Sequence, residues 1–104
     1  MAVCMIIENP DQTPEQAQEV LALVRESGPV PPQGARLMIA GPATPGMRII
    51  SVWDSEESIH RFFSERLGPA QKQVGVSLDN AKRTVFEVTT LVAGDLTGAP
   101  EPAR

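Results

Sequence analysis

The sequence predicts one α+β domain, a four-stranded antiparallel sheet with two helices on one face. Four strand-like runs and two helix-start signals alternate in the order β-α-β-β-α-β. The strand-like runs are apolar on both of their alternating sides, which a monomer with one covered face does not need. At 104 residues with 41% apolar content, the chain has the material for a single core.

The first strand and the first helix are marked by their ends. Residues 2–8 form a β-rich apolar run that stops at the turn-forming residues 9–11. Thr13 follows as a helix N-cap, with Pro at the first helical position and Gln16 placed to complete a capping box. The helix keeps an apolar face at i, i+3, i+4 and i+7 spacing until residues 28–29, Gly-Pro, end it.

A proline-rich linker separates this helix from a hairpin. Residues 28–34 read GPVPPQG, and the three prolines favour extended backbone and forbid a further helix. Strand-like runs at 35–40 and 48–53 are joined by GPATPG, whose Gly and Pro residues supply the turn. We therefore expect two antiparallel strands here.

The second helix is expected over residues 55–67. Asp54 is its predicted N-cap, and Glu57 stands at the N3 position near the positive end of the helix dipole. The helix is predicted to end at residues 68–69, Gly-Pro, with a short helical turn over 69–74 after it. Its predicted buried stripe consists of Ile59, Phe62, Phe63 and Leu67.

The last strand is predicted at 83–92, where the run RTVFEVTTLV is rich in β-branched residues. Residues 93–104 are mostly small residues and prolines, so we expect a flexible C-terminal tail. The predicted domain therefore comprises residues 1–92.

This element order is that of the ferredoxin-like split unit, in which two helices cover one face of the sheet. The other face is left bare, yet the first strand is apolar on both sides, since Val3, Met5 and Ile7 alternate with Cys4 and Ile6. An exposed apolar face of this size is unusual in a monomer. We expect a two-fold homodimer in which the bare faces cover each other.

Composition narrows the classes of partner. The net charge is −4 and the nine Lys and Arg residues are scattered, which argues against nucleic acid. The apolar run at residues 2–7 is too short to span a bilayer, so we expect a cytoplasmic protein without a membrane partner. Cys4, the single cysteine, lies in an apolar strand and is interpreted as a buried hydrophobe rather than a nucleophile.

Three segments carry a family resemblance: ENPDQTPEQ after the first strand, VWDSEESIHRFFSERLGPA after the hairpin and VFEV in the last strand. With them, residues 2–92 resemble the dimeric α+β barrel superfamily, which includes antibiotic biosynthesis monooxygenase-like proteins. The resemblance implies a dimeric α+β barrel with a pocket between sheet and helices for a small apolar, aromatic or polyketide-type molecule. Members of such a fold differ in their chemistry, so the fold alone does not assign a reaction.

The resemblance also indicates which chemistry is missing. Haem-degrading members use an Asn on the first strand, a Trp on the second helix and a later His. Here the strand has no Asn before its turn, and Phe62 and Lys72 occupy the other two positions. Quinone-forming oxygenases of the superfamily use Trp, Asn and Tyr around the substrate, and this chain has no Tyr. We therefore expect no haem.

His60 is the candidate catalytic residue, because imidazole is well suited to proton transfer near neutral pH and His60 is the only His. An exposed i, i+4 pair with Glu56 is the alternative explanation for it. Rings and thioethers suit a pocket wall, although core packing would use them too. Charged residues in apolar strands suit orientation of a ligand, although Arg36 or Arg48 pairing with Glu87 would also explain them. The predicted substrate-binding residues are Trp53, Phe62, Phe63, Met38, Met5, Arg36 and Glu87.

One His and one Cys form no metal-ligand set, and no Gly-rich phosphate loop is present, so neither a metal nor another cofactor is expected. The sequence favours a cofactor-independent small-molecule enzyme of secondary or aromatic metabolism, either monooxygenase-like or a cyclase or isomerase. The alternative is a non-catalytic small-ligand-binding or accessory dimer, which the missing Tyr favours.

Overall fold

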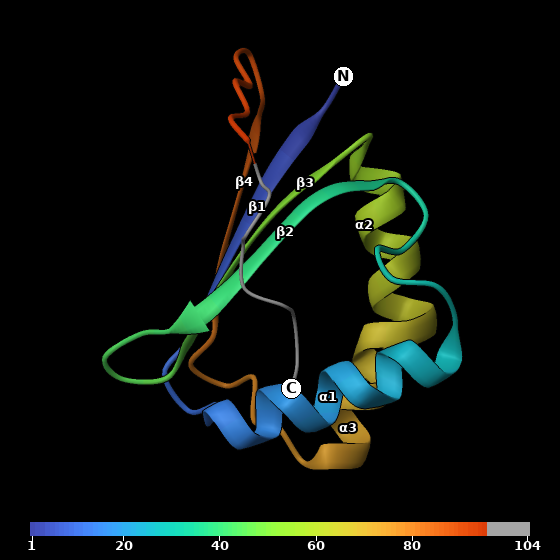
Figure 1. The fold of residues 1–104 in the computed structure, drawn as a ribbon. Coiled ribbons are helices and arrows are strands. Elements are labelled where there is room, and N and C mark those ends of the chain that lie inside the picture. Colours follow the sequence, from blue (N-terminus) through green and yellow to red (C-terminus); the bar gives the residue numbers. More distant parts are fainter. Residues whose placement is uncertain (96–104) are drawn as a thin grey trace.

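The computed structural model describes residues 1–95, and in it one four-stranded antiparallel sheet carries helices on one side (Figure 1). The predicted tail falls largely on residues 96–104, which lie outside the described part. The spatial order of the strands is β2-β3-β1-β4, which confirms the predicted ferredoxin-like α+β fold. The strands are β1 (Val3–Asn9), β2 (Ala35–Pro42), β3 (Met47–Trp53) and β4 (Lys82–Glu87).

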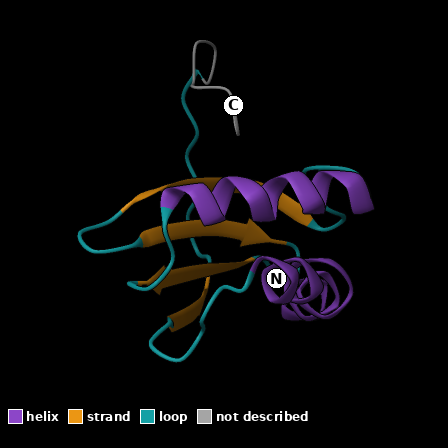
Figure 2. Ribbon diagram, turned by 90° about the horizontal axis from the view of Figure 1, so that it is seen from below, coloured by secondary structure: helices purple, strands orange, loops and turns teal. Residues whose placement is uncertain are grey.

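Two helical arms cover the sheet. The first is α1 (Pro14–Ser27), and the second runs through α2 (Glu56–Phe62), η1 (Phe63–Leu67) and α3 (Gly68–Val74). In Figure 2, α1 is seen from the side while the second arm is seen nearly end-on, so the two arms cross at a large angle.

The start of α1 follows the prediction. The Thr13 hydroxyl accepts a hydrogen bond from the backbone N–H of Gln16 over 3.0 Å. The Gln16 side-chain oxygen accepts one in return from the Thr13 N–H over 3.1 Å. This capping box satisfies two N–H groups that no helical carbonyl can reach.

The second arm corrects two predictions. Its N-cap is Ser55, whose hydroxyl accepts from the N–H of Ser58, whereas Asp54 forms an ion pair with Arg36. The helix also does not end at Gly68, because residues Phe63–Leu67 form a π-helical turn and the Gly68 N–H bonds to the carbonyl of Phe63. A Cβ at Gly68 would lie 2.8 Å from that carbonyl oxygen, so only Gly admits this close approach. Pro69 then stands in the first turn of α3, where its missing N–H is tolerated.

The last strand is shorter than predicted. The run at 83–92 was expected to pair throughout, but β4 ends at Glu87, followed by one more bond from the Val88 N–H to the Ala2 carbonyl. The neighbouring strand β1 begins at Val3, so beyond this point no backbone remains for residues 89–92 to pair with.

The two faces of the sheet differ in what covers them. Met5 and Trp53 belong to the core cluster beneath the helices, together with Val20, Val24, Ile59, Phe62 and Ala70. The side chains that alternate with them point to the opposite face, which we call the open face because no helix of the described residues covers it. Its residues, by strand register, are Cys4, Ile6, Glu8, Leu37, Ile39, Arg48, Ile50, Val52, Lys82, Thr84 and Phe86.

Along the strands, one half of the open face is apolar and the other end is charged. Cys4, Ile6 and their lateral neighbours are almost entirely apolar, and Ile39 and Phe86 remain about half exposed at 53% and 49%. At the other end Glu8 forms an ion pair with Arg48 beside Lys82. The predicted two-sided apolar character is therefore confirmed over one half of this face.

None of the helices within residues 1–95 combines the length and the apolarity needed to cross a membrane.

Candidate functional site

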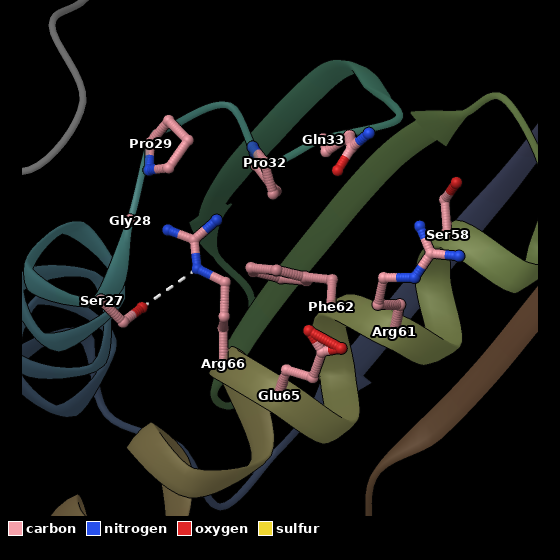
Figure 3. A pocket seen from close by; sticks show the side chains of 10 residues that line it. All are labelled: Ser27, Gly28, Pro29, Pro32, Gln33, Ser58, Arg61, Phe62, Glu65 and Arg66. Carbon is pink, nitrogen blue, oxygen red and sulfur yellow. Dashed lines mark hydrogen bonds between the residues drawn. The ribbon is translucent and has the colours of Figure 1, made fainter.

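A cleft of about 210 Å³ lies where the linker after α1 passes over the second helical arm (Figure 3). Its floor is Phe62, and we call it the Phe62 cleft. The linker forms one wall and α2 with η1 forms the other, so the cleft joins segments about thirty positions apart in sequence. Its lining residues are Ser27, Gly28, Pro29, Pro32, Gln33, Ser58, Arg61, Phe62, Glu65 and Arg66.

Arg66 ties the two walls together. Its Nε donates to the hydroxyl of Ser27 over 3.0 Å, and its Nη2 donates to the carbonyl of Val24 over 2.8 Å. These acceptors lie in the last turn of α1, where carbonyls have no helical partner and a positive charge is favourable. The guanidinium also lies over the Phe62 ring, with Cζ 5.5 Å from the ring centroid.

Gly28 makes room for this arrangement. A Cβ at position 28 would lie 3.1 Å from Cζ of Arg66, which is tighter than most contacts that a Cβ makes. The guanidinium is therefore held between the Phe62 ring and the backbone of Gly28.

The remaining charged groups of the cleft are Arg61 and Glu65. Arg61 forms an ion pair with Glu57, one helical turn before it, over 2.8 Å. Glu65, one turn after Arg61, has no hydrogen bond or ion pair within the described residues. Figure 3 shows that Arg61, Glu65 and Arg66 project from the same helical arm, with Arg66 reaching the linker near Gly28 and Arg61 turned back toward Ser58. The cleft therefore combines two guanidinium groups with one unpaired carboxylate.

Phe62 connects the cleft with the interior. Its ring packs against Trp53 with centroids 5.4 Å apart and planes inclined at 38°. Trp53 in turn donates from Nε1 to the hydroxyl of Ser51 over 2.8 Å, and both residues are inaccessible to solvent. The space beneath the helices is thus occupied by packed side chains around this aromatic pair.

No model of a known protein family matches the chain, and no curated protein matches it. Solved structures do match. A protein of Mycobacterium tuberculosis superposes with a TM-score of 0.63 at 15% identity, over 89% of this chain and 100% of that one. SnoaB, a cofactor-independent oxygenase from Streptomyces nogalater, superposes with a TM-score of 0.57 at 11% identity, over 89% and 98%. A Chloroflexus aurantiacus protein assigned as an antibiotic biosynthesis monooxygenase gives 0.55 at 21% identity, over 89% and 100%.

The chain has the fold of antibiotic biosynthesis monooxygenase-like proteins. The resemblance expected from the sequence is confirmed at the level of this fold. At identities of 21% and below, the likeness extends to the backbone and carries no residue roles.

Within this monooxygenase-like fold, the predicted site residues do not converge on one place. Met5, Trp53 and Phe62 come together in the core cluster, and of these only Phe62 lines the cleft. Phe63 is partly buried at the start of η1 and lines neither of the two best-defined clefts. His60 is exposed on α2, also outside both clefts, and its side chain has no bonding partner among residues 1–95.

The remaining predicted substrate-binding residues, Met38, Arg36 and Glu87, lie on the two edge strands of the sheet, β2 and β4. Met38 is 39% exposed on β2, and Glu87 is exposed at the end of β4. Arg36 pairs with Asp54, and Arg48 pairs with Glu8, so the pairing of either arginine with Glu87 is not formed. Each arginine pairs instead with a carboxylate beside its own strand, Asp54 at the end of β3 for Arg36 and Glu8 on β1 for Arg48.

Asn9 corrects one point of the family comparison. The first strand was read as having no Asn before its turn, but β1 extends through Asn9, which is 2% exposed. Its amide donates to the carbonyl of Ser77 over 2.9 Å, and its side-chain oxygen accepts from the N–H of Asp11. Asn9 therefore ties the end of β1 to the segment before β4.

Sequence reasoning missed Arg61, Glu65 and Arg66 as cleft residues. Their spacing does indicate a shared helix face, because Arg61 is four residues before Glu65 and Phe62 is four residues before Arg66. What the sequence did not indicate is that the linker lies across that face.

A second cleft, also about 210 Å³, lies at the opposite end of the molecule beside the hairpin turn. It is bordered by the Glu8–Arg48 ion pair and Lys82. In the described chain, no group of three or more His, Cys, Asp or Glu side chains is placed to hold a metal ion.

Proposed function

We propose that this protein is a homodimeric, cofactor-independent enzyme that acts on a small aromatic or polyketide-type molecule bound in the Phe62 cleft. Glu65 carries the proposal. Its carboxylate has no partner within the described residues, yet it shares a cleft with two guanidinium groups and an aromatic floor. Such a combination suits removal of a proton from an aromatic substrate and stabilisation of the anion that results.

The proposed chemistry begins with one shared step. Oxygenation, cyclisation and isomerisation of polyketide-type molecules all start by removing a proton from an acidic C–H or O–H group. Glu65 accepts that proton, and the guanidinium of either Arg66 or Arg61 stabilises the negative oxygen that forms. In an oxygenation without cofactor the substrate supplies the electrons. A CH₂ group and O₂ become a carbonyl group and one molecule of water.

The fold supports this proposal by analogy. SnoaB, which shares the fold, is a cofactor-independent oxygenase. A fold hosts several reactions, so the analogy supports the class of chemistry and leaves the substrate to experiment.

The proposed dimer forms through the open face. In the single chain, Ile39 and Phe86 expose about half of their surface on a face whose central residues are apolar. Covering it with a second copy removes this apolar area from water and closes two sheets into a barrel-like pair.

The enzyme proposal is tested with the full chain, naphthol as an aromatic probe with an acidic hydroxyl, and oxygen uptake above the uncatalysed rate. Glu65→Gln should lower turnover by about 100-fold or more, the range for loss of a general base, while binding of naphthol persists. His60→Ala is the comparison variant, because His60 is exposed and outside the cleft. If His60→Ala abolishes turnover and Glu65→Gln does not, the base is His60, as first expected from the sequence.

A non-catalytic ligand-binding dimer is the second candidate. It is favoured by the filled interior beneath the helices. There the Trp53 N–H donates to the Ser51 hydroxyl, and because both residues are inaccessible to solvent, neither polar group faces a substrate. Binding of naphthol with no turnover by the wild type in oxygen uptake or product analysis would support it over the enzyme.

A further inference from the structure

We infer that a second copy of this chain docks on the open face with the two-fold axis parallel to the strands, which brings Glu8 of each copy opposite Arg48 of the other. The helical arms lie on the other face of the sheet and leave this one accessible (Figure 1). The inference rests on the proposed function only through the homodimer and is independent of the Phe62 cleft. It fixes the orientation of the two sheets and names a charged contact between the copies.

Three rows of side chains cross the open face, one for each alternate position of β1. The charged row contains Glu8 and Arg48, with Lys82 at its β4 end and Gly41 at its β2 end. In the order from β2 to β4, the other two rows are Ile39, Ile50, Ile6 and Thr84, and Leu37, Val52, Cys4 and Phe86. A second copy must therefore cover a surface with one charged end and one apolar end.

The two ends of the open face decide between two orientations of the second copy. Aligned sheets keep their strand directions within about 30° of each other, so the two-fold axis between them runs either across the strands or parallel to them. An axis across the strands exchanges the two ends, so the charged row of one copy meets the row of Cys4 and Phe86 in the other. Burial of charges against apolar side chains is costly. An axis parallel to the strands keeps the ends together, so the charged rows meet each other and the apolar rows meet each other.

The parallel axis also matches opposite charges within the charged row. It reverses the lateral order of the strands, β2-β3-β1-β4, so β1 of one copy lies over β3 of the other. Glu8 on β1 then faces Arg48 on β3 of the second copy, because the two residues share one row. By the same operation Ile6 faces Ile50 of the second copy. One symmetry operation therefore pairs both the charged and the apolar side chains.

Both charged side chains remain available to a second partner. Within one chain, Nη2 of Arg48 donates to Oε2 of Glu8 over 2.8 Å, and the two side chains are 54% and 47% exposed. A guanidinium has five N–H donors and a carboxylate has two acceptor oxygens, so each binds more than one group. Facing sheets lie about 10 Å apart, a gap that a Glu and an Arg side chain span together. The interface then carries a network of four alternating charges, which stabilises more than an isolated exposed pair does.

The experiment uses two charge-reversal variants of the full chain, Glu8→Arg and Arg48→Glu. In a homodimer of either variant like charges face each other, so the dissociation constant of the dimer should rise by about tenfold or more. In an equimolar mixture each reversed side chain faces an opposite charge. Native mass spectrometry should then find heterodimers as about nine tenths of all dimers, where random pairing gives about half. The ion pair within each chain stays broken in the mixture, so only contacts between copies restore the dimer.

Arg36→Glu and Asp54→Arg are the matched controls. These two residues also form an exposed ion pair, but they lie outside the open face. Each control variant should dimerise as tightly as the wild type, and the two should pair at random when mixed. Random pairing of the Glu8 and Arg48 variants, or homodimers of either as tight as the wild type, would overturn the inference.

Salt provides a measurement that needs no variant, in case a charge reversal unfolds the chain. The dissociation constant of the wild-type dimer should rise with ionic strength, and a constant that does not change with salt would contradict the charged contact. A monomeric wild type would overturn the homodimer together with this orientation. A wild-type dimer whose variants pair at random would keep the homodimer and reject the orientation alone. The enzyme proposal is judged separately, by the turnover of naphthol.

Discussion

The indole nitrogen of Trp53 donates to the hydroxyl of Ser51 over 2.8 Å, and neither residue is accessible to water. Ser51→Ala would therefore leave a buried N–H group without an acceptor. We expect the free energy of unfolding to fall by about 1–3 kcal/mol, the cost of an unsatisfied buried donor. Urea denaturation measures the change.

Ser64→Ala is the control for this substitution. Ser64 is exposed, and its hydroxyl makes only a 3.3 Å bond to the carbonyl of Arg61. Equal losses in the two variants would show that the Trp53 contact contributes nothing specific.

Gly28→Ala should disturb the Arg66 anchor. The new Cβ would stand 3.1 Å from Cζ of Arg66, so the guanidinium must shift by a few tenths of an ångström, which strains its hydrogen bonds to Ser27 and Val24. We expect about 1–2 kcal/mol of lost stability, since hydrogen bonds made by a charged group are involved. Gly41→Ala is the control, because a Cβ there meets nothing within 4 Å. A Gly28→Ala variant as stable as the wild type would contradict the tight fit of the guanidinium.

Gly68→Ala tests the π-helical turn by the sign of its effect. In an ordinary helix this substitution stabilises by about 0.5–1 kcal/mol. Here the Cβ would lie 2.8 Å from the Phe63 carbonyl oxygen, so we expect destabilisation of about 1–3 kcal/mol, as for an overpacked site. A rise in the thermal midpoint would mean that the turn is not π-helical in solution.

Ile39→Glu should separate the proposed dimer. Ile39 is 53% exposed in the single chain, so a charged residue there is tolerated by the monomer but not inside an apolar interface. Light scattering should give twice 11.2 kDa for the wild type and 11.2 kDa for the variant. Met38→Glu, the neighbouring position on the opposite face, is the control and should remain dimeric. A wild-type mass of 11.2 kDa would refute the dimer directly.

Cys4 provides a pH-dependent prediction. Burial raises the pKa of its thiol above the ordinary value. The folded state therefore holds this proton more strongly than the unfolded state does. The resulting stabilisation is complete below the unfolded pKa and is lost as pH rises through the folded pKa.

The free energy of unfolding of the wild type should thus fall more steeply than that of Cys4→Ala between about pH 8 and about pH 10. Urea denaturation at several pH values checks this. If the free energy of unfolding changes with pH equally in the two proteins, the pKa of Cys4 is the same in the folded and the unfolded state.

The fold was largely predictable because its signals are local. Thr13 and Gln16 mark the start of α1 from four adjacent residues, and the alternation of β1 is visible in the strand itself. The misplaced N-cap at Asp54 has a tertiary cause, since Arg36 on β2 engages that carboxylate and Ser55 takes the cap. The length of β4 likewise depends on where its partner strand begins.

The candidate site was less predictable than the fold. Phe62 was expected in a pocket wall because it is aromatic and lies on a helix. The cleft above it arises only when the 28–34 linker crosses the second arm, and no local pattern encodes that crossing. The π-helical turn also depends on a carbonyl five residues before Gly68, where the sequence pattern suggested a helix end.

The double use of Arg66 limits how ligand preference can change over evolutionary time. Arg66 closes the last turn of α1 and also borders the cleft, so replacing it alters the integrity of a helix together with any affinity. Gln33 borders the same cleft and makes no hydrogen bond within the described residues, so it can vary without that penalty. Divergence of specificity among descendants of this chain should therefore accumulate at the linker wall, while the arginine that joins the two helical arms persists.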